Sequence, residues 1–308
     1  MESNHNHNHN HNHGHSHDVS NISGKKIFWV TVLNALITTA EFIGGILSGS
    51  LALLSDAVHN LSDTLAIALS YVAFRISKKP KNERKTYGYK RAEILSAFLN
   101  SIVLFAISIF LVYEAVNRFR FPKTIDGNLM LIVAIIGLLA NLFSVLLLHK
   151  DSQENLNIKS SYLHLLSDTV SSVGVIFGGI LIKFWQIYWI DPLITILISI
   201  YILKETFQLI KHTVDILMQS AAPLNYDEIK KEIEQITEVK NIHHVHSWMS
   251  NEKTIYFDAH IDVENLLLSE IEKIYDKIEH ILKEHYGISH ITIQAEVDKC
   301  CDKNLFKS

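Results

Sequence analysis

Cysteine is scarce in this chain. Only Cys300 and Cys301 occur among 308 residues, and they are adjacent and close to the C-terminus. With the C-terminus in the cytoplasm, a reducing compartment, this pair is expected to have a thiol or metal-binding role, not a structural disulfide.

A strong net charge and a cleavable leader are also missing. The 28 basic and 32 acidic side chains give a net charge of -4, which indicates no partner and gives no reason to expect nucleic-acid binding. A polar, histidine-rich stretch precedes the first apolar run, and no small-residue cleavage site follows that run. The sequence therefore predicts no cleavable signal peptide.

Long apolar runs dominate the chain as far as about residue 210. A helix needs about 20 mostly apolar residues to cross a bilayer. Six segments meet this criterion: Ile27–Leu47, Ala52–Ile76, Ala92–Val116, Leu129–Leu148, Ser161–Phe184 and Ile190–Ile210. We therefore expect a membrane protein with a six-helix transmembrane bundle over residues 25–212.

The basic residues of the links predict the orientation. The link after the second segment, residues 78–91, is strongly basic, whereas the link around Ser48–Ser50 has no Lys or Arg. The contrast is weakened by Arg118, Arg120 and Lys123 in the link after the third segment. The positive-inside rule still places both termini in the cytoplasm. The Lys-, Asn- and Ile-rich composition favours a bacterial plasma membrane.

The N-terminal residues 1–24 form a histidine-rich tail. Seven histidines lie between His5 and His17, mostly alternating with asparagine. Such a low-complexity tract cannot build a core and is expected to be disordered. It is either a cytoplasmic tail that gathers metal or an engineered purification tag. The break in the alternation at His15-Ser-His17 favours the native tail.

Two apolar segments each carry a histidine and an aspartate four residues apart. They are His59 with Asp63, and His164 with Asp168. Residues at this spacing project from one helix face. Two such helices together supply two imidazoles and two carboxylates, a tetrahedral set that suits zinc. An Asp at mid-membrane costs about 2.5–3.5 kcal/mol on insertion scales, and a divalent cation would offset that cost.

The same polar residues have a plainer interpretation, in which they only hydrogen-bond neighbouring helices. The repetition of the pair at one spacing favours the metal site. Asp56 lies three residues before His59. It either orients the imidazole as a hydrogen-bond partner or lies at the mouth of the transport pathway.

The pattern of residues 213–308 is that of a small cytoplasmic domain. Helical spacing and two-residue alternation predict the order α-β-β-α-β. The elements are Asp227–Thr237, Val239–Met249, Ile255–Val263, Leu267–Tyr286 and His290–Val297. We expect a small open α+β sandwich similar to half of a ferredoxin-like fold.

Several motifs resemble those of the cation diffusion facilitator family, with the zinc-transporting branch most similar. They are Ser55-Asp-Ala-Val-His-Asn-Leu-Ser-Asp63, Tyr87-Gly-Tyr-Lys-Arg-Ala-Glu93, His164-Leu-Leu-Ser-Asp168 with Ser171-Ser-Val-Gly-Val175, Asp191-Pro192, and Ile242-His-His-Val-His-Ser-Trp248. The resemblance covers nearly the whole chain after the tail. It implies a homodimer in the lipid membrane that exchanges cytoplasmic zinc for protons.

The resemblance also implies the transport ligands, which are His59, Asp63, His164 and Asp168. Cadmium-tolerant members tend to have Asp at the place of His59, so the histidine favours zinc. Some relatives bind metal in the loop after the second helix, but residues 82–89 contain no histidine here, and no metal is expected there.

A second metal site is implied in the cytoplasmic domain. The resemblance assigns it to His243, His260 and Glu296, with a tail cysteine, Cys300 or Cys301, as a further ligand in some relatives. Its fourth ligand stays open. Zinc would then be a regulatory ligand as well as the substrate. The alternative is a solvated cluster of surface histidines, of which His244, His246 and His290 are candidates.

The function that these features predict is zinc export by proton antiport, not enzymatic catalysis. Alternatives are broader efflux of cadmium, cobalt or nickel, a passive metal channel, and an intramembrane metalloenzyme. The enzyme is the weakest of these, because no His-Glu-x-x-His motif occurs and four protein ligands leave no open metal position. A passive pore would carry zinc inward, since each charge moved against 100 mV costs about 2.3 kcal/mol.

Overall fold

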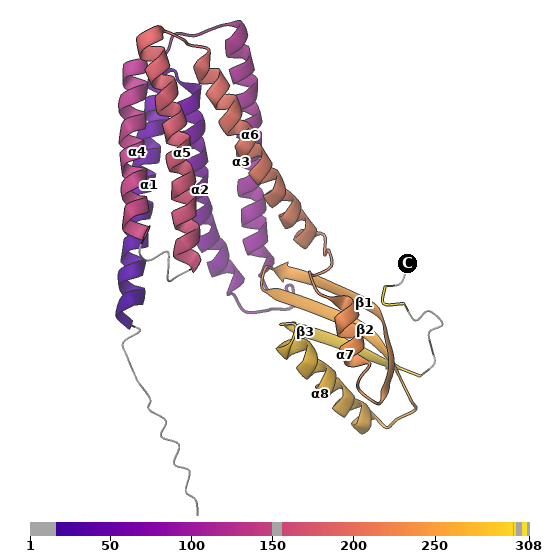
Figure 1. Ribbon diagram of the computed structural model, residues 1–308. Helices are drawn as coiled ribbons and strands as arrows, with labels where there is room; N and C mark the ends of the chain where they lie inside the picture. Colours follow the sequence, from indigo (N-terminus) through magenta and orange to yellow (C-terminus); the bar gives the residue numbers. More distant parts are fainter. Residues whose placement is uncertain (1–16, 150–155, 298, 300–303, 307–308) are drawn as a thin grey trace, which may run out of the picture. The chain divides into compact units, whose positions relative to one another are not determined.

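The computed structural model describes residues 17–149, 156–297, 299 and 304–306 (Figure 1). Most of the histidine-rich tail, and both Cys300 and Cys301, therefore lie outside the described residues. The chain forms two compact units. The first comprises residues 1–64 and 108–201, and the second comprises residues 65–107 and 202–308.

Six long helices precede the C-terminal sheet in the described chain. They are α1 (His17–Ser48), α2 (Leu51–Ser77), α3 (Arg91–Arg120), α4 (Gly127–His149), α5 (Leu156–Trp185) and α6 (Ile190–Leu217). Five of them, all except α2, are long and apolar enough to cross a membrane. Helix α2 is long enough, but its first half carries several polar residues, including Asp56, His59 and Asp63. Five spans are thus found where six were predicted, and the sixth stays a prediction.

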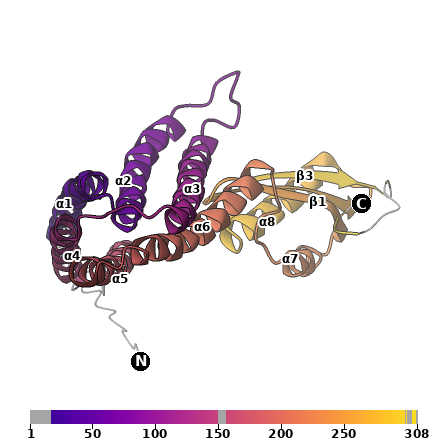
Figure 2. The same cartoon turned by 90° about the horizontal axis from the view of Figure 1, so that it is seen from above.

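In the first unit, α4 packs between α1 and α5 (Figures 1 and 2). Small residues allow close contact between these helices: a Cβ added to Gly44 of α1 would lie 2.7 Å from Val133 of α4. A core that includes Leu53, Met130 and Val175 joins α2, α4 and α5. On α4, Ile132, Leu139 and Leu146 follow one another at seven-residue intervals and are more than half exposed. This apolar stripe is the surface expected of a helix that faces lipid.

The second unit contains a three-stranded sheet with two helices. Its elements are α7 (Tyr226–Ile233), β1 (Val239–Asn251), β2 (Thr254–Val263), α8 (Leu268–Glu284) and β3 (His290–Glu296), in the predicted order α-β-β-α-β (Figure 1). The apolar faces of α7 and α8 supply Ile229, Ile233, Ile274, Ile278 and Leu282 to the core, where they meet Phe257 and Ile261 of β2.

The sheet combines antiparallel and parallel strand pairing. The strand order is β1-β2-β3, in which β1 and β2 are antiparallel and β2 and β3 are parallel. Helix α8 provides the crossover that a parallel pair requires. The sheet is therefore mixed, and the ferredoxin-like description fits it only loosely. Helix α7 ends at Ile233, four residues before the predicted end, and β1 extends to Asn251.

Strand β1 is interrupted by a bulge. Its register against β2 shifts between His243 and His246, and His244 has a positive φ of 53°. Next to this bulge, the backbone N–H groups of His244 and Val245 donate to the carbonyl oxygens of Asn304 and Leu305. The extra residue thus changes the direction of the side chains on either side of it.

Candidate metal centres

The first candidate centre lies in the first unit, where α2 and α5 meet. His59 and Asp63 lie one turn apart on α2, with 3.7 Å between His59 Nε2 and Asp63 Oδ2. Asp168 of α5 approaches the same ring nitrogen, with Oδ1 3.9 Å from His59 Nε2. Asp168 is only 2% exposed, whereas His59 and Asp63 are partly accessible. The structure therefore brings three of the four predicted ligands together.

The fourth predicted ligand, His164, belongs to α5 and precedes Asp168 by one turn. Its side chain is outside the described part of the structure. In a zinc tetrahedron, neighbouring ligand atoms lie about 3.3 Å apart, given zinc–ligand bonds of about 2.0–2.2 Å. The distances of 3.7 and 3.9 Å exceed this separation by about half an ångström. A small inward movement of side chains would bring these donors to coordination distance.

Asp56 connects the two ligand-bearing helices. It is 1% exposed, and its carboxylate accepts hydrogen bonds from Ser171 Oγ at 2.7 Å and from Ser172 Oγ at 3.4 Å. Asp56 belongs to α2 and both serines belong to α5. This carboxylate therefore holds α2 against α5 one turn away from His59. An orienting role for Asp56 toward the His59 imidazole stays a prediction.

A buried carboxylate that the sequence interpretation missed lies beside this centre. Glu41 of α1 is 1% exposed, and its Oε2 accepts a hydrogen bond from Asn60 Nδ2 at 3.3 Å. Gly137 of α4 makes room for it, since a Cβ there would lie 2.0 Å from Glu41 Oε1. A signal was present in the sequence, because Glu41 is the only charged residue in the apolar segment Ile27–Leu47.

The N-terminus of α2 is fixed by Asp191, the first acidic residue of α6. Its side chain is fully buried and accepts hydrogen bonds from Ser50 Oγ at 2.5 Å, from Leu51 N at 2.9 Å and from Ala52 N at 3.1 Å. Arg118 also approaches it, at 3.8 Å, and donates to the carbonyl oxygen of Gly49. A carboxylate at this position satisfies free N–H groups and complements the helix dipole. Asp191 therefore positions the helix that carries His59 and Asp63.

We expect Asp191→Ala to destabilise the protein by about 1–3 kcal/mol, because it leaves buried N–H donors without their acceptor. The matched control is Asp126→Ala, which removes an exposed carboxylate that caps α4 through the N–H groups of Asn128 and Leu129. The control should cost about 1 kcal/mol or less. Thermal unfolding midpoints of the purified proteins test the difference. Equal shifts in the two variants would contradict the assignment of Asp191 as the anchor of α2.

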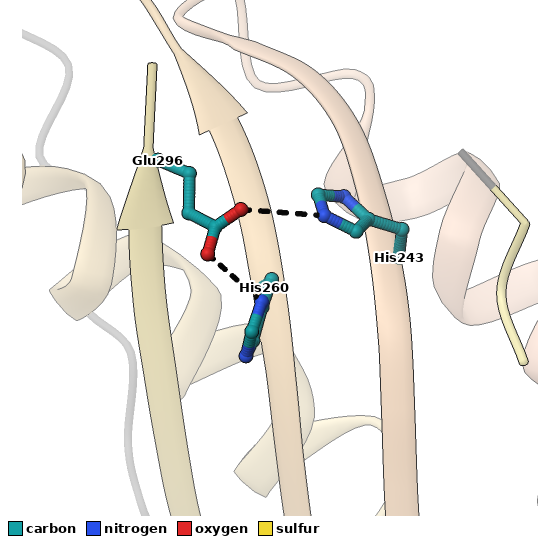
Figure 3. A group of neighbouring side chains, drawn as sticks. All are labelled: His243, His260 and Glu296. Atoms are coloured by element: carbon teal, nitrogen blue, oxygen red, sulfur yellow. Dashed lines mark ion pairs between the residues drawn. The ribbon is translucent and has the colours of Figure 1, made fainter. Parts of the chain in front are cut away.

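The second candidate centre lies on the sheet of the second unit. Figure 3 shows His243 of β1, His260 of β2 and Glu296 of β3 pointing toward one another. Glu296 Oε1 is 3.1 Å from His260 Nδ1, and Glu296 Oε2 is 3.7 Å from His243 Nε2. Within the described residues, this is the one group in which three potential ligand atoms lie within 4.8 Å of one another.

The register of the strands explains why these residues meet. His243 is the direct partner of His260, and Glu296 is the direct partner of Asp262, two residues further along β2. Residues that are directly opposite or two apart share a sheet face. Phe257, Ala259 and Ile261 alternate with these positions and face the core. The three candidate ligands consequently lie on the face opposite that core.

The polar groups around His243 are buried and incompletely satisfied. His243 is 1% exposed, and its Nε2 has no hydrogen-bond partner among the described residues. Asp262 is also buried, with Oδ2 3.9 Å from His243 Nδ1, and its Oδ1 has no hydrogen-bond partner in the described chain. An unsatisfied buried polar atom is costly, and a cation ligated by His243 would satisfy it.

The charge of Glu296 fits a cationic neighbourhood. Burial raises the pKa of this carboxyl, but electrostatic interactions with His260, Lys299 and His243 and the hydrogen bond from Lys299 outweigh that effect, and its pKa lies below the ordinary value. Glu296 Oε1 also accepts a hydrogen bond from Gln294 Nε2 at 2.8 Å. The donor set of two imidazoles and one carboxylate suits zinc.

The structure does not describe the predicted additional ligands. Cys300 and Cys301 fall outside the described residues. Before the two cysteines in the chain, Glu296 lies in the edge strand β3. After them, the carbonyl oxygen of Asn304 accepts a hydrogen bond from His244 N of the other edge strand, β1. The surface-histidine alternative fits His246 and His290, which are exposed, whereas His243 is buried.

Comparison with known proteins defines the class of the chain. The profile described as the cation efflux transmembrane domain matches residues 27–218, and the profile described as the cytoplasmic domain of cation efflux proteins matches residues 221–298. The chain therefore belongs to the cation efflux family, also called the cation diffusion facilitators, as its motifs predicted. Members of this family are integral membrane proteins that export metal cations and are not enzymes.

Individual relatives align over most of the chain. Zinc transporter ZitB of Escherichia coli is 39% identical over 282 residues, which are 90% of this chain and 89% of the relative. The cadmium, cobalt and zinc/H(+)-K(+) antiporter of Bacillus subtilis is 42% identical over 263 residues, which are 84% of each chain. Metal cation efflux system protein CzcD of Cupriavidus metallidurans is 35% identical over 269 residues, which are 87% of this chain and 85% of the relative.

Proposed function

We propose that this cation efflux protein exports Zn²⁺ from the cytoplasm in exchange for H⁺. The observation that carries the proposal is the meeting of His59, Asp63 and Asp168, on two helices, inside an apolar bundle. His164, one turn before Asp168, completes the proposed site. Zinc is the transported substrate of this centre and not a resident cofactor.

The donor set supports zinc as the main substrate. Imidazole nitrogen and carboxylate oxygen in a four-ligand arrangement match the tetrahedral preference of zinc. The Escherichia coli relative is named as a zinc transporter. A second candidate is broader divalent-cation efflux, because the name of the Bacillus subtilis relative also includes cadmium and cobalt.

Proton exchange follows from the chemistry of the ligands. An imidazole must be neutral to bind a metal, and it ordinarily titrates near pH 6.5. Zinc and protons compete for the same ligand atoms, so the centre binds zinc when it faces the neutral cytoplasm, where protons are fewer. When it faces a side where protons are more available, His59 and His164 take up protons and release zinc. The return of the protonated centre then carries protons inward.

Movement of the ligand-bearing helices would expose the centre alternately to the two sides. Helix α2 is tied to α6 through Asp191 and to α5 through Asp56. His59 and Asp168 therefore belong to helices that are cross-linked by hydrogen bonds near the site.

We propose that α2 is the sixth span, that both termini lie in the cytoplasm, and that the membrane is a bacterial plasma membrane.

The cytoplasmic domain is proposed as a zinc-sensing and pairing domain. Residues 221–298 match a profile that is named for a dimer, which supports a homodimer. His243, His260 and Glu296 would hold a regulatory zinc, with Cys300 or Cys301 as a further ligand. The unsatisfied buried Nε2 of His243 supports this assignment. Bound zinc would offset the negative charge of Glu296 and Asp262 and favour close approach of paired domains.

Replacement of a transport ligand tests the main proposal. We expect Asp63→Ala and Asp168→Ala each to reduce zinc flux in proteoliposomes to the background rate, because loss of one of the four proposed ligands leaves an incomplete tetrahedron and weakens binding of the dehydrated cation in the apolar bundle. Asp215→Ala removes an exposed carboxylate of α6 and serves as the matched control with normal flux. Size-exclusion profiles confirm that each variant is folded. Near-normal flux in folded Asp168→Ala protein would remove Asp168 from the site.

The regulatory site has a separate test. We expect the double substitution His243→Ala and His260→Ala to lower the zinc transport rate about 5-fold or more without abolishing it, which is the lower range of typical allosteric coupling. The control is His212→Ala with His280→Ala, which removes two exposed histidines of α6 and α8. Transport is measured against free zinc concentration. Identical curves for the two double variants would leave His243 and His260 without a regulatory role.

A further inference from the structure

A cavity with basic and aromatic lining residues lies in the second unit, apart from both metal centres. Its volume is about 400 Å³. One wall is the link between α2 and α3 with the first turns of α3, and the other is formed by β1 and β2. Its lining residues include four basic side chains, Arg84, Lys85, Lys90 and Arg91, and two aromatic ones, Trp248 and Tyr256. This volume is within the range of small-ligand sites.

A second cavity, of about 350 Å³, continues the first. The two share Thr86, Tyr87, Lys90 and Tyr256, and the second adds Lys81 and His290 among its lining residues. The combined hollow thus has lysine or arginine side chains along most of the link. Neither cavity has an Asp or Glu among its lining residues.

Within the described residues, no ion pair joins a carboxylate to the basic residues that line this hollow, which are Lys81, Arg84, Lys85, Lys90 and Arg91. Glu93 and Glu252 line a neighbouring cavity to which Lys90 also contributes, but they do not line the hollow itself. Lys90 Nζ instead donates to Thr254 Oγ1 at 3.0 Å. Elsewhere in the same unit lysines are paired, as in Lys277 with Glu238 at 3.3 Å and Lys240 with Glu264 at 2.8 Å. Several like charges around one hollow repel one another, and a bound anion would relieve that repulsion.

Aromatic rings make one wall of the hollow rigid. Trp248 stacks on Tyr256 with ring centroids 5.3 Å apart, and Tyr87 meets Tyr256 edge-on at 5.1 Å. Tyr256 is 4% exposed. The basic link itself is ordered by a turn, in which Asn82 Oδ1 accepts hydrogen bonds from Arg84 N and Lys85 N. The basic side chains of the link therefore project from a backbone that this turn holds in place.

We propose that this hollow binds a phosphate group. Two arginines and three lysines without carboxylate partners are the side chains that recognise phosphate, with arginine able to donate two parallel hydrogen bonds. The hollow begins where α2 ends and α3 begins, so one source of the phosphate is the headgroup of an anionic membrane lipid. The other source is free phosphate in solution. Basic links that only determine membrane orientation need neither a cavity nor an aromatic wall.

Trp248 provides a direct reporter of binding, since it lines the hollow. The chain has four tryptophans, and substitution of Trp29, Trp185 and Trp189 by Phe leaves Trp248 alone. The full-length single-tryptophan protein is placed in phosphatidylcholine nanodiscs. One arm replaces phosphatidylcholine stepwise by phosphatidylglycerol. The other arm adds sodium phosphate at an ionic strength held constant with sodium chloride.

We expect a saturable change in Trp248 fluorescence in at least one arm. Saturation with phosphatidylglycerol alone identifies a lipid headgroup, and saturation with sodium phosphate identifies a soluble anion. Arg84→Gln with Lys85→Gln should weaken the apparent affinity about 10-fold or more, because two charge-assisted contacts are lost. These two residues are exposed in the link, so the fold should tolerate their replacement.

The control variant is Lys79→Gln with Lys211→Gln, which removes the same number of exposed positive charges outside the hollow. It should leave the fluorescence response unchanged. The proposal is overturned if neither arm gives a saturable response. It is also overturned if the two double variants weaken binding equally, since that result indicates general attraction by charge.

Discussion

Buried polar groups in an apolar bundle need hydrogen-bond partners, and this requirement governs the transmembrane structure. The hydrogen bonds between helices that meet this requirement mainly involve α2. Asp191 of α6 accepts hydrogen bonds from the first N–H groups of this helix, and Asp56 accepts hydrogen bonds from serines of α5. Asn60 donates to Glu41 of α1. Three helices, α1, α5 and α6, therefore make polar contacts with α2. Lipid cannot provide such contacts, so α2 depends on its neighbours more than the other helices do.

The same contacts explain how a metal centre can exist there. His59 and Asp63 would be unfavourable in a helix that faces lipid, but the hydrogen bonds of Asp191 and Asp56 hold α2 against α6 and α5. Asp168 then reaches His59 from α5. The polar residues of α2, which is not among the five helices apolar enough to cross a membrane, thus include His59 and Asp63 of the proposed transport site.

Much of this arrangement could be predicted from the sequence, because it depends on local spacing. The repeated His-Asp pairs predicted the residues of α2 that lie close to Asp168, and alternating residues predicted the strands that carry His260 and Glu296. The order of helices and strands in the C-terminal part also followed from periodicity. These features depend on which residues are three, four or two positions apart.

Other features depend on contacts that no local pattern reveals. Asp191 accepts hydrogen bonds from backbone N–H groups of a helix that is distant in sequence. Every residue type except proline has such a group, so the sequence does not show which residues Asp191 contacts. The parallel pairing of β2 and β3 is a choice of register and direction made by the packing of α8. His243 is buried next to an irregular bulge, where the alternation of side chains breaks down. Helix α2 was predicted as a span but is not among the five helices found apolar enough, and it carries Asp56, His59 and Asp63.

If one centre binds zinc and protons alternately, the fluxes of the two ions must be coupled, and simultaneous measurement of both tests this coupling. Purified protein is reconstituted in proteoliposomes that contain a zinc indicator and a pH indicator, and the interior is made acidic before zinc is added outside. We expect the pH gradient to accelerate zinc entry and the interior to become alkaline as zinc enters. Both responses should be absent in Asp168→Ala protein. Zinc entry that is independent of the gradient and leaves the interior pH unchanged would show that one centre does not exchange zinc for protons.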